Sequence, residues 1–249
     1  IDAGGDGIQS ETALVVRGGD FTVRTGSESG AAAAQGTEST KGLKAGTELL
    51  VTGGSLDITA ADDALHSDGS MTIAGGTFLL ATSDDGLHAE TSLEIDAGSI
   101  DVTTCYEGLE SAAITINGGD IRITATDDGV NTVGAGTTAS AGAGPGGPGG
   151  QDGNGAERGD YPLTITGGYL FIDALGDGID ANGPVTMTGG TVVINGPTAN
   201  NNGALDFVSF DISGGLLVAV GSAGMAMAPD ESSAQPTSGL SFRSTLSAG

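Results

Sequence analysis

Apolar and polar residues alternate along most of this chain, in short runs separated by acidic corners and by small residues. The segment from Asp84 to Thr104 shows the unit. It has two acidic residues and Gly86, the apolar Leu87, an alternating run, a corner of small residues, and a second alternating run. Successive side chains of a β-strand point to opposite faces, so each run predicts a short strand with one buried face. No segment has the apolar period of an amphipathic helix.

Pairs of glycines give this unit a period, which is 21 or 22 residues where nothing interrupts it. A fixed period of this size is typical of solenoid proteins. Leucine-rich repeats share the length, but their leucine–asparagine consensus is absent here, and TPR and ankyrin repeats need helices. Three short strands and three corners in each unit predict an all-β parallel β-helix of about eight turns. The pairs are Gly18–Gly19, Gly53–Gly54, Gly75–Gly76, Gly118–Gly119, Gly167–Gly168, Gly189–Gly190 and Gly214–Gly215, with Ala97–Gly98 as a degenerate member.

The shortest strand of each unit carries one inward apolar residue, and these residues are expected to stack as a column. Neighbouring members would lie about 4.8 Å apart, the spacing of paired strands. We predict one domain over 1–249, with loop insertions at 26–40 and 134–159 and an irregular cover at 222–249 that contains a last strand at Leu240–Phe242. The predicted column is Ile8, Leu43, Leu65, Leu87, Leu109, Val130, Ile179 and Leu205.

The charge of the chain is strongly one-sided, with 32 Asp and Glu against 7 Lys and Arg. Such a chain lacks the clustered cations that bind nucleic acid through phosphates. Its 37% hydrophobic content, in regular alternation, argues against an acidic disordered chain. The single cysteine excludes an internal disulfide, and no apolar run approaches the length of a membrane span.

Aligning the units places the acidic residues in three columns at one corner of the predicted rod. Like charges stacked directly at strand spacing are destabilising, so a repeated arrangement predicts a counterion. The lysines Lys41 and Lys44 fall in the same columns and are expected to replace a cation at that end. The predicted metal ligands are Asp62, Asp63, Asp84, Asp85, Glu107, Glu110, Asp127, Asp128, Asp177, Asp180 and Asp206.

Ca²⁺ suits these residues best, because it accepts six to eight oxygen ligands in variable geometry, whereas Mg²⁺ demands a tighter octahedron. Zn²⁺ could use His66 and His88, one turn apart, but no third nitrogen or thiol ligand is evident. The alternative is that the acidic residues only accept hydrogen bonds from corner amides.

The repeated Asp-Asp-Gly-Leu-His corners resemble a known family, together with the segments Tyr106–Glu110, Gly196–Thr198, Asn202–Asp206 and Gly221–Pro229. The family is that of bacterial secreted proteins described as carbohydrate-binding domain-containing. The resemblance covers essentially the whole chain and implies a right-handed parallel β-helix related in fold to pectate lyases. It also implies Ca²⁺ at these corners, binding of polygalacturonate or cellulose, and a secreted or cell-surface location. Because family chains usually continue at both ends, this one looks like the C-terminal part of a longer protein.

Three functions remain open on this basis. Ca²⁺-dependent binding of an acidic polysaccharide without catalysis is favoured, with Tyr106, His66 and His88 as weaker candidates for sugar contacts. A Ca²⁺-stabilised extracellular fibre is the first alternative, because the ends of the rod, or an apolar stripe of Phe171, Val193 and Val218, would allow self-association. That stripe would otherwise lie under the C-terminal segment. The second alternative is a Ca²⁺-dependent polysaccharide lyase, which would need an Arg or Lys base such as Lys41 or Lys44.

Overall fold

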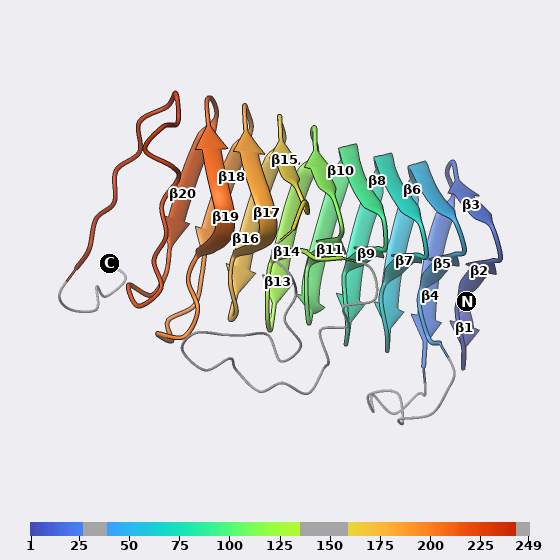
Figure 1. Ribbon diagram of the computed structural model, residues 1–249. Coiled ribbons are helices and arrows are strands. Elements are labelled where there is room, and N and C mark those ends of the chain that lie inside the picture. Colours follow the sequence, from blue (N-terminus) through green and yellow to red (C-terminus); the bar gives the residue numbers. More distant parts are fainter. Residues whose placement is uncertain (27–38, 135–158, 243–249) are drawn as a thin grey trace.

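The computed structural model describes residues 1–26, 39–134 and 159–242, and these form a parallel β-helix of about eight turns. Figure 1 shows the turns following one another along a rod, with the N-terminus at one end and the C-terminal segment at the other. The described residues contain no helix, and therefore none long and apolar enough to cross a bilayer. The predicted insertions at 26–40 and 134–159 lie almost entirely outside the described residues.

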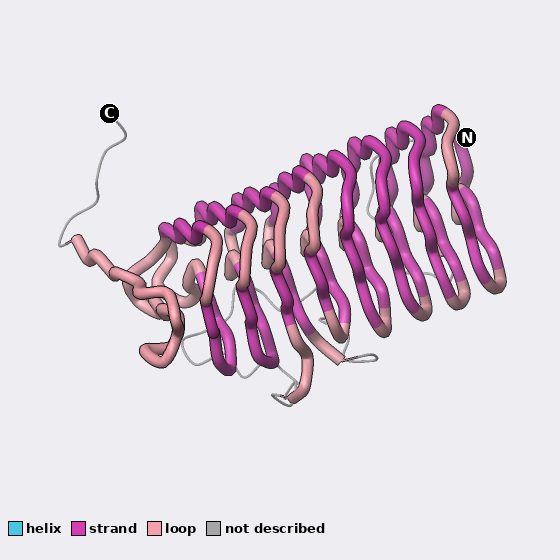
Figure 2. Tube along the Cα trace, turned by 90° about the horizontal axis from the view of Figure 1, so that it is seen from above, coloured by secondary structure: helices cyan, strands magenta, loops and turns pink. Residues whose placement is uncertain are grey.

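Each turn is built from strands of three columns, and every strand pairs in parallel with its equivalents in the neighbouring turns (Figure 2). The short-strand column contains β2 (Ile8–Ser10), β5 (Leu43–Ala45), β7 (Leu65–Ser67), β9 (Leu87–Ala89), β11 (Leu109–Ser111), β14 (Val130–Thr132) and the first parts of β17 (Ile179–Met187) and β19 (Leu205–Ile212). The second column contains β3 (Ala13–Val16), β12 (Ile114–Ile116), β15 (Leu163–Ile165), the first parts of β6, β8 and β10, and the later parts of β17 and β19.

The third column contains β1 (Asp2–Ala3), β4 (Asp20–Thr25), β13 (Asp120–Ala125), β16 (Tyr169–Ala174), β18 (Thr191–Asn195), β20 (Leu216–Val220) and the later parts of β6, β8 and β10. In the three central turns the second and third strands are continuous through the glycine corner, as β6 (Glu48–Ala60), β8 (Ser70–Thr82) and β10 (Ser92–Cys105). The corner itself still requires glycine. Gly54 has a φ of 111°, and a Cβ there would approach the Gly19 carbonyl oxygen to 2.9 Å.

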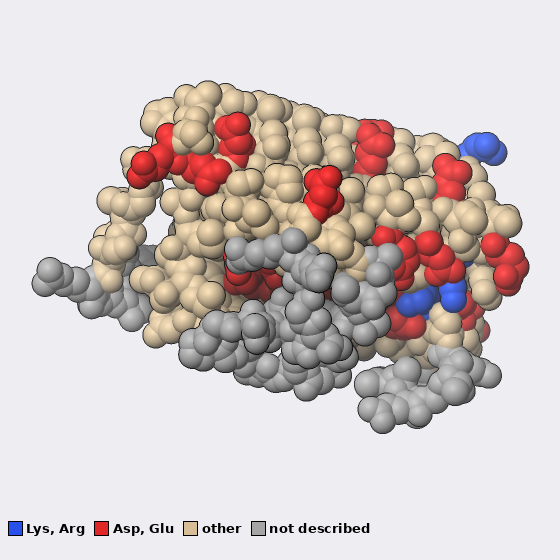
Figure 3. Space-filling model, in the orientation of Figure 1, with Lys and Arg blue, Asp and Glu red and all other residues tan. Residues whose placement is uncertain are grey.

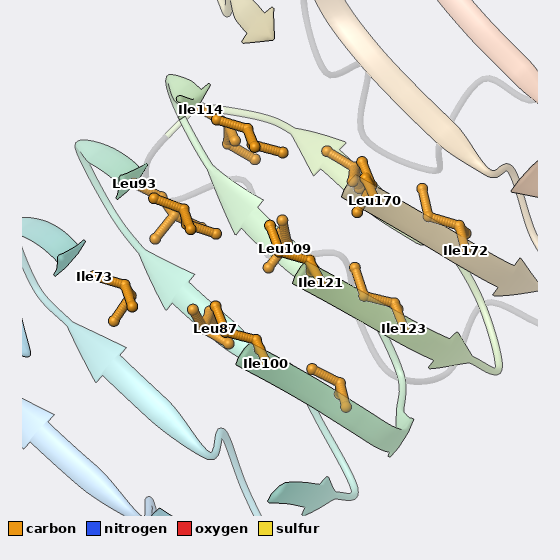
Figure 4. Packing of buried hydrophobic residues seen from close by; sticks show 14 of the residues in the cluster. Ile73, Leu87, Leu93, Ile100, Leu109, Ile114, Ile121, Ile123, Leu170 and Ile172 are labelled. Atoms are coloured by element: carbon orange, nitrogen blue, oxygen red, sulfur yellow. The ribbon is translucent and has the colours of Figure 1, made fainter. Parts of the chain in front are cut away.

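The inward apolar residues stack as the sequence predicts. Leu65 pairs with Leu87, Leu87 with Leu109, and Leu109 with Val130, and all four are fully buried. Figure 4 shows Leu87 and Leu109 one turn apart, each beside the isoleucine of the facing strand in its own turn, Ile100 and Ile121. The core is therefore a single column of apolar layers along the rod, and every layer is closed by residues from one turn.

The C-terminal segment lacks the last strand that the sequence predicts. Asp230 N–H donates to the Phe210 carbonyl at 2.8 Å and Gln235 N–H to the Ile212 carbonyl at 3.0 Å, so this segment covers the open edge of β19. The predicted last strand at Leu240–Phe242 is wrong, because these residues form no strand and Leu240 is 82% exposed. Without a partner strand or a layer to pack against, its apolar side chain has nothing to hold it to the rod.

The apolar stripe is correctly aligned, but the described part of the C-terminal segment leaves it open. Phe171 pairs with Val193, and Val193 with Val218, on the consecutive strands β16, β18 and β20. Val218 remains 42% exposed. The alternative that the stripe lies under the C-terminal segment is wrong for the described residues, since that segment takes its backbone hydrogen bonds from β19 and not from β20.

Candidate functional site

The acidic corner before each short strand is in register from turn to turn. In the short-strand column the pairs run from Gln9 and Lys44 through His66, His88, Glu110, Asn131 and Asp180 to Asp206. Just before it, the backbone carbonyls of Lys41, Asp63, Asp85, Glu107, Asp128 and Asp177 each accept an N–H from the preceding turn. We call this corner the ladder. Stacking brings the predicted site residues together along one edge of the rod.

One oxygen of several ladder carboxylates binds a backbone amide of the next turn. Asp63 Oδ1 accepts the Asp85 N–H at 3.2 Å, and Asp128 Oδ1 accepts the Asp177 N–H at 2.6 Å. Asp177 in turn accepts the Gly203 N–H at 2.5 Å. The alternative, in which the acidic residues accept hydrogen bonds from corner amides, is thus correct for one oxygen of each of these three carboxylates. Hydrogen bonds from corner amides do not explain what the second oxygen of each carboxylate binds.

Lys41 neutralises the first acidic turn of the ladder. Its Nζ lies 2.8 Å from Asp62 Oδ1 and 2.7 Å from Asp63 Oδ2. Burial alone would lower the lysine pKa, but the two carboxylates raise it well above its usual value. Burial would likewise raise the pKa of Asp63, yet its partners His66 and Lys41 hold it well below the usual range. Lys41 thus supplies the positive charge at this end of the ladder, and no ion pair of Lys44 occurs among the described residues.

The two histidines come next and differ in how their nitrogens are held. His66 is buried, with Nδ1 2.7 Å from Asp63 and Nε2 2.8 Å from Asp68. His88 has Nδ1 3.0 Å from Asp85, while its Nε2 lies 3.6 Å from Glu110 and 3.7 Å from Glu90. Burial alone would lower the pKa of His88, but Asp85, Asp63 and Glu110 raise it to about 9.

Beyond the histidines the ladder contains buried acids without lysine or arginine partners. Glu107 is 2% exposed, and burial, a hydrogen bond with Glu110 and the Glu110 charge raise its pKa well above the usual value. Burial and the charge of Asp180 do the same for Asp128. No ion pair from a described Lys or Arg reaches Glu107 or Asp128. Two hydrogen-bonded carboxyl groups must share a proton or a cation. On the face that Figure 3 shows, the Lys and Arg side chains, in blue, lie toward the N-terminal end of the rod.

Asn131 joins these acids and leaves one atom without a partner. Its Nδ2 donates to Glu107 Oε2 at 3.0 Å, and its Oδ1, in a side chain only 5% exposed, has no hydrogen-bond donor among the described residues. Buried polar atoms are almost always paired, because an unpaired one costs about 1–3 kcal/mol. We call Glu107, Glu110, Asp128 and Asn131 the oxygen cluster.

Comparison with known proteins identifies the family of this chain. The family model described as carbohydrate-binding domain-containing protein matches residues 1–86 and 80–129. The chain belongs to this family. No curated protein and no solved structure matches it. The matched residues include the ladder from Gln9 to Asp128. Both histidines of this carbohydrate-binding domain-containing chain, His66 and His88, therefore lie in the matched part.

The other predicted site residues of this family member flank these groups. Asp84, beside Asp62 in the outermost column, has a pKa raised to about 6 by burial and by the charges of Asp63 and Asp62. Burial raises the pKa of Asp85 to about 8. The hydrogen bond with His88 opposes this increase, and the charge of Asp63 adds to it. Asp177 and Asp206 line a pocket of about 300 Å³, together with residues 225–227.

The three weaker sugar-contact candidates are less available than the sequence suggests. Both nitrogens of His66 already bind carboxylates. Tyr106 stands between Asp84 and Asp127 in the outermost column and is half-buried. Burial and a hydrogen bond with Asp127 raise its pKa, so its hydroxyl is also engaged.

The sequence alone did not mark Asn131, Asp68 or Glu90 as candidate ligands. Each had a signal in the repeat. Asp68 and Glu90 both stand two residues after a ladder histidine, and Asn131 occupies the column position of Glu110 in the next turn. Only side-chain geometry distinguishes these residues from ordinary corner residues.

Proposed function

We propose that this chain binds an acidic polysaccharide through Ca²⁺ held at the oxygen cluster, outside the cell or at its surface, and does not cleave the polymer. The observation that carries the proposal is the unpaired Oδ1 of Asn131 among carboxylates that lack lysine and arginine partners. Membership of a carbohydrate-binding domain-containing family supports a carbohydrate as the partner.

The donor atoms of the oxygen cluster are of the kind that Ca²⁺ prefers. They are carboxylate oxygens of Glu107, Glu110 and Asp128 and the amide oxygen of Asn131, and an all-oxygen set of this kind is what Ca²⁺ prefers. A divalent cation would give Asn131 Oδ1 its missing partner. It would also remove the need for Glu107 and Glu110 to share a proton, since both carboxylates could be ionised beside it.

Such a site recognises an acidic sugar by direct bonding. Bound Ca²⁺ accepts more ligands than one corner supplies, so a uronate carboxylate can take a position that water would otherwise fill. A polymer carries many such carboxylates and can engage several turns of the ladder together, which raises avidity without tight individual contacts. Neutral sugars are usually held by aromatic platforms, and aromatic residues are only 4% of this chain.

The ladder is poorly equipped for lyase chemistry. A β-elimination needs a neutral base close to the bound uronate. Lys41, a candidate base, is fixed between Asp62 and Asp63, and its pKa is raised well above the usual value. It therefore stays protonated at neutral pH, which favours binding without cleavage.

Affinity electrophoresis in gels containing polygalacturonate tests the proposal, run with Ca²⁺ and with a chelator. We expect retardation with Ca²⁺ only, lost in Asn131→Leu and Asp128→Ala and kept in Asp57→Asn, an exposed acidic residue of the third strand column. Equal retardation in a neutral glucan gel with chelator would contradict the Ca²⁺ bridge. Unsaturated products released from polygalacturonate would contradict the absence of cleavage.

A further inference from the structure

We propose that Asn202 and Gly203 form a self-modification site, at which the chain closes a cyclic imide and converts the Asn202 amide to a carboxylate. The pair lies at the corner that leads into β19, near the C-terminal end of the ladder. In an Asn-Gly sequence the glycine nitrogen can attack the preceding side-chain carbonyl carbon, because glycine has no side chain to hinder the approach. The fold supplies this step with a base and with a hydrogen-bond donor.

The base is Asp177, which occupies the position equivalent to Gly203 one turn earlier. Its Oδ1 accepts the Gly203 N–H at 2.5 Å. A peptide N–H is a very weak acid, and its nitrogen becomes a nucleophile only as the proton leaves. The carboxylate is therefore already bound to the proton that a general base has to remove.

The hydrogen-bond donor is Asn201. Its Nδ2 donates to Asn202 Oδ1 at 3.2 Å, which polarises the carbonyl group that is attacked. The same hydrogen bond stabilises the negative charge that develops on this oxygen in the tetrahedral intermediate. The turn that carries the donor is anchored, because Ser222 Oγ donates to Asn200 Oδ1 at 2.7 Å.

Packing of the last turns requires glycine as the nucleophilic residue. A Cβ at Gly203 would lie 2.7 Å from the Met225 carbonyl oxygen. Gly203 also lines the pocket of about 300 Å³ together with Asp177 and Asp206. Conversion of the neighbouring amide thus adds one negative charge to this acidic end of the ladder.

Two of the other Asn-Gly pairs lack such a base. In Asn195–Gly196 the glycine N–H donates to the Val220 carbonyl at 2.7 Å, and in Asn117–Gly118 to the Ile95 carbonyl at 3.2 Å. A backbone carbonyl holds the N–H in place but does not take its proton. These two pairs are therefore internal controls within the same chain.

The reaction is balanced with water as the co-reactant. Gly203 N forms a bond to Asn202 Cγ, and its proton passes to Asp177 Oδ1. The Cγ–Nδ2 bond then breaks, and the leaving nitrogen takes that proton and departs as ammonia. Water opens the imide at either carbonyl, which leaves aspartate or isoaspartate at position 202 and Asp177 in its original state.

Peptide mass mapping after prolonged incubation of the whole chain at neutral pH tests the proposal, in the native state and in guanidinium. Conversion is followed by the mass increase from amide to acid at each pair. We expect Asn202 to convert faster in the folded chain than in guanidinium, and Asn195 and Asn117 to convert more slowly when folded. Asp177→Asn should slow the folded reaction about tenfold or more, because its amide oxygen still accepts the N–H but does not take the proton.

Asn201→Ala keeps the test valid if Asp177→Asn does not fold, because Asn201 is a partly exposed turn residue. It should slow conversion of Asn202 several-fold and leave Asn195 unchanged. The site is overturned if Asn202 converts no faster in the fold than in guanidinium, or if neither variant changes its rate. The reaction needs no metal ion and is measured in chelator, so its outcome does not decide the Ca²⁺ proposal.

Discussion

The side-chain amide of Asn131 donates to Glu107 at 3.0 Å from the following turn, and in doing so leaves its own oxygen without a donor. A glutamate takes the equivalent place one turn earlier, at Glu110. The amide therefore reduces the negative charge of this part of the ladder while keeping an oxygen in the column. That combination is what a cation site between stacked carboxylates requires.

Removing divalent ions should lower the melting temperature of the wild-type protein. A ligand that binds only the folded state adds about 2.7 kcal/mol at a concentration one hundred times its Kd. Calorimetry with Ca²⁺ and with a chelator measures this difference. Asn131→Leu should melt at the same temperature under both conditions, while Asp57→Asn should keep the wild-type difference. A wild-type melting temperature that does not change on chelation would argue for corners that bind only amides and water.

Stability of the metal-free protein should fall as the pH rises from about 4 to 8. The pKa of Asp84 is raised to about 6 and that of Asp85 to about 8, so the folded state holds protons that the unfolded chain releases near pH 4. The stability from these protonated acids is complete below the unfolded pKa and is lost as the pH passes the folded values. Each proton contributes a slope of at most about 1.4 kcal/mol per pH unit.

Urea unfolding in chelator across this pH range measures the effect, and Ca²⁺ should flatten the profile because it favours the ionised carboxylates. Asp85→Asn should reduce the slope without metal, because an amide does not titrate. A metal-free stability that instead rises between pH 4 and 8 would contradict the raised pKa values.

Lys41→Met should destabilise the fold by about 3–5 kcal/mol, the usual cost of removing one partner of a buried ion pair. The affected carboxylate is Asp63, which is almost completely buried and lies 2.7 Å from Nζ. The double variant Lys41→Met, Asp63→Asn should recover part of the loss, since asparagine keeps the oxygen that binds the Asp85 amide. Chemical denaturation measures both, with Lys44→Met as the control that changes stability little.

Leu87→Ala should cost about 2–5 kcal/mol, because it opens a cavity in a column that is filled on both sides by Leu65 and Leu109. The matched control is Leu79→Ala, on an outward position that is 48% exposed, where the change should be within about 0.5 kcal/mol. Equal effects at the two positions would mean that the turns are not stacked as described.

The sequence by itself determined the solenoid and its columns. Alternation with a period of two decides which side chains face inward, and a repeat of 21 or 22 residues decides which turn lies on which. Because neighbouring strands pair in parallel, equivalent residues of successive turns then lie directly beside one another. The sequence therefore placed three residues correctly in the core, Leu65, Leu87 and Leu109. It also placed His66, His88 and Glu110 correctly at the corner.

Only the tertiary structure decided which charged groups pair. His66 and His88 have the same spacing from their acidic neighbours in the sequence, but burial and side-chain direction give them different partners. His66 Nε2 lies 2.8 Å from Asp68, whereas His88 Nε2 lies 3.6 Å from Glu110. The C-terminal segment binds the edge of β19 because unpaired backbone groups there need partners, a requirement that no periodic pattern records.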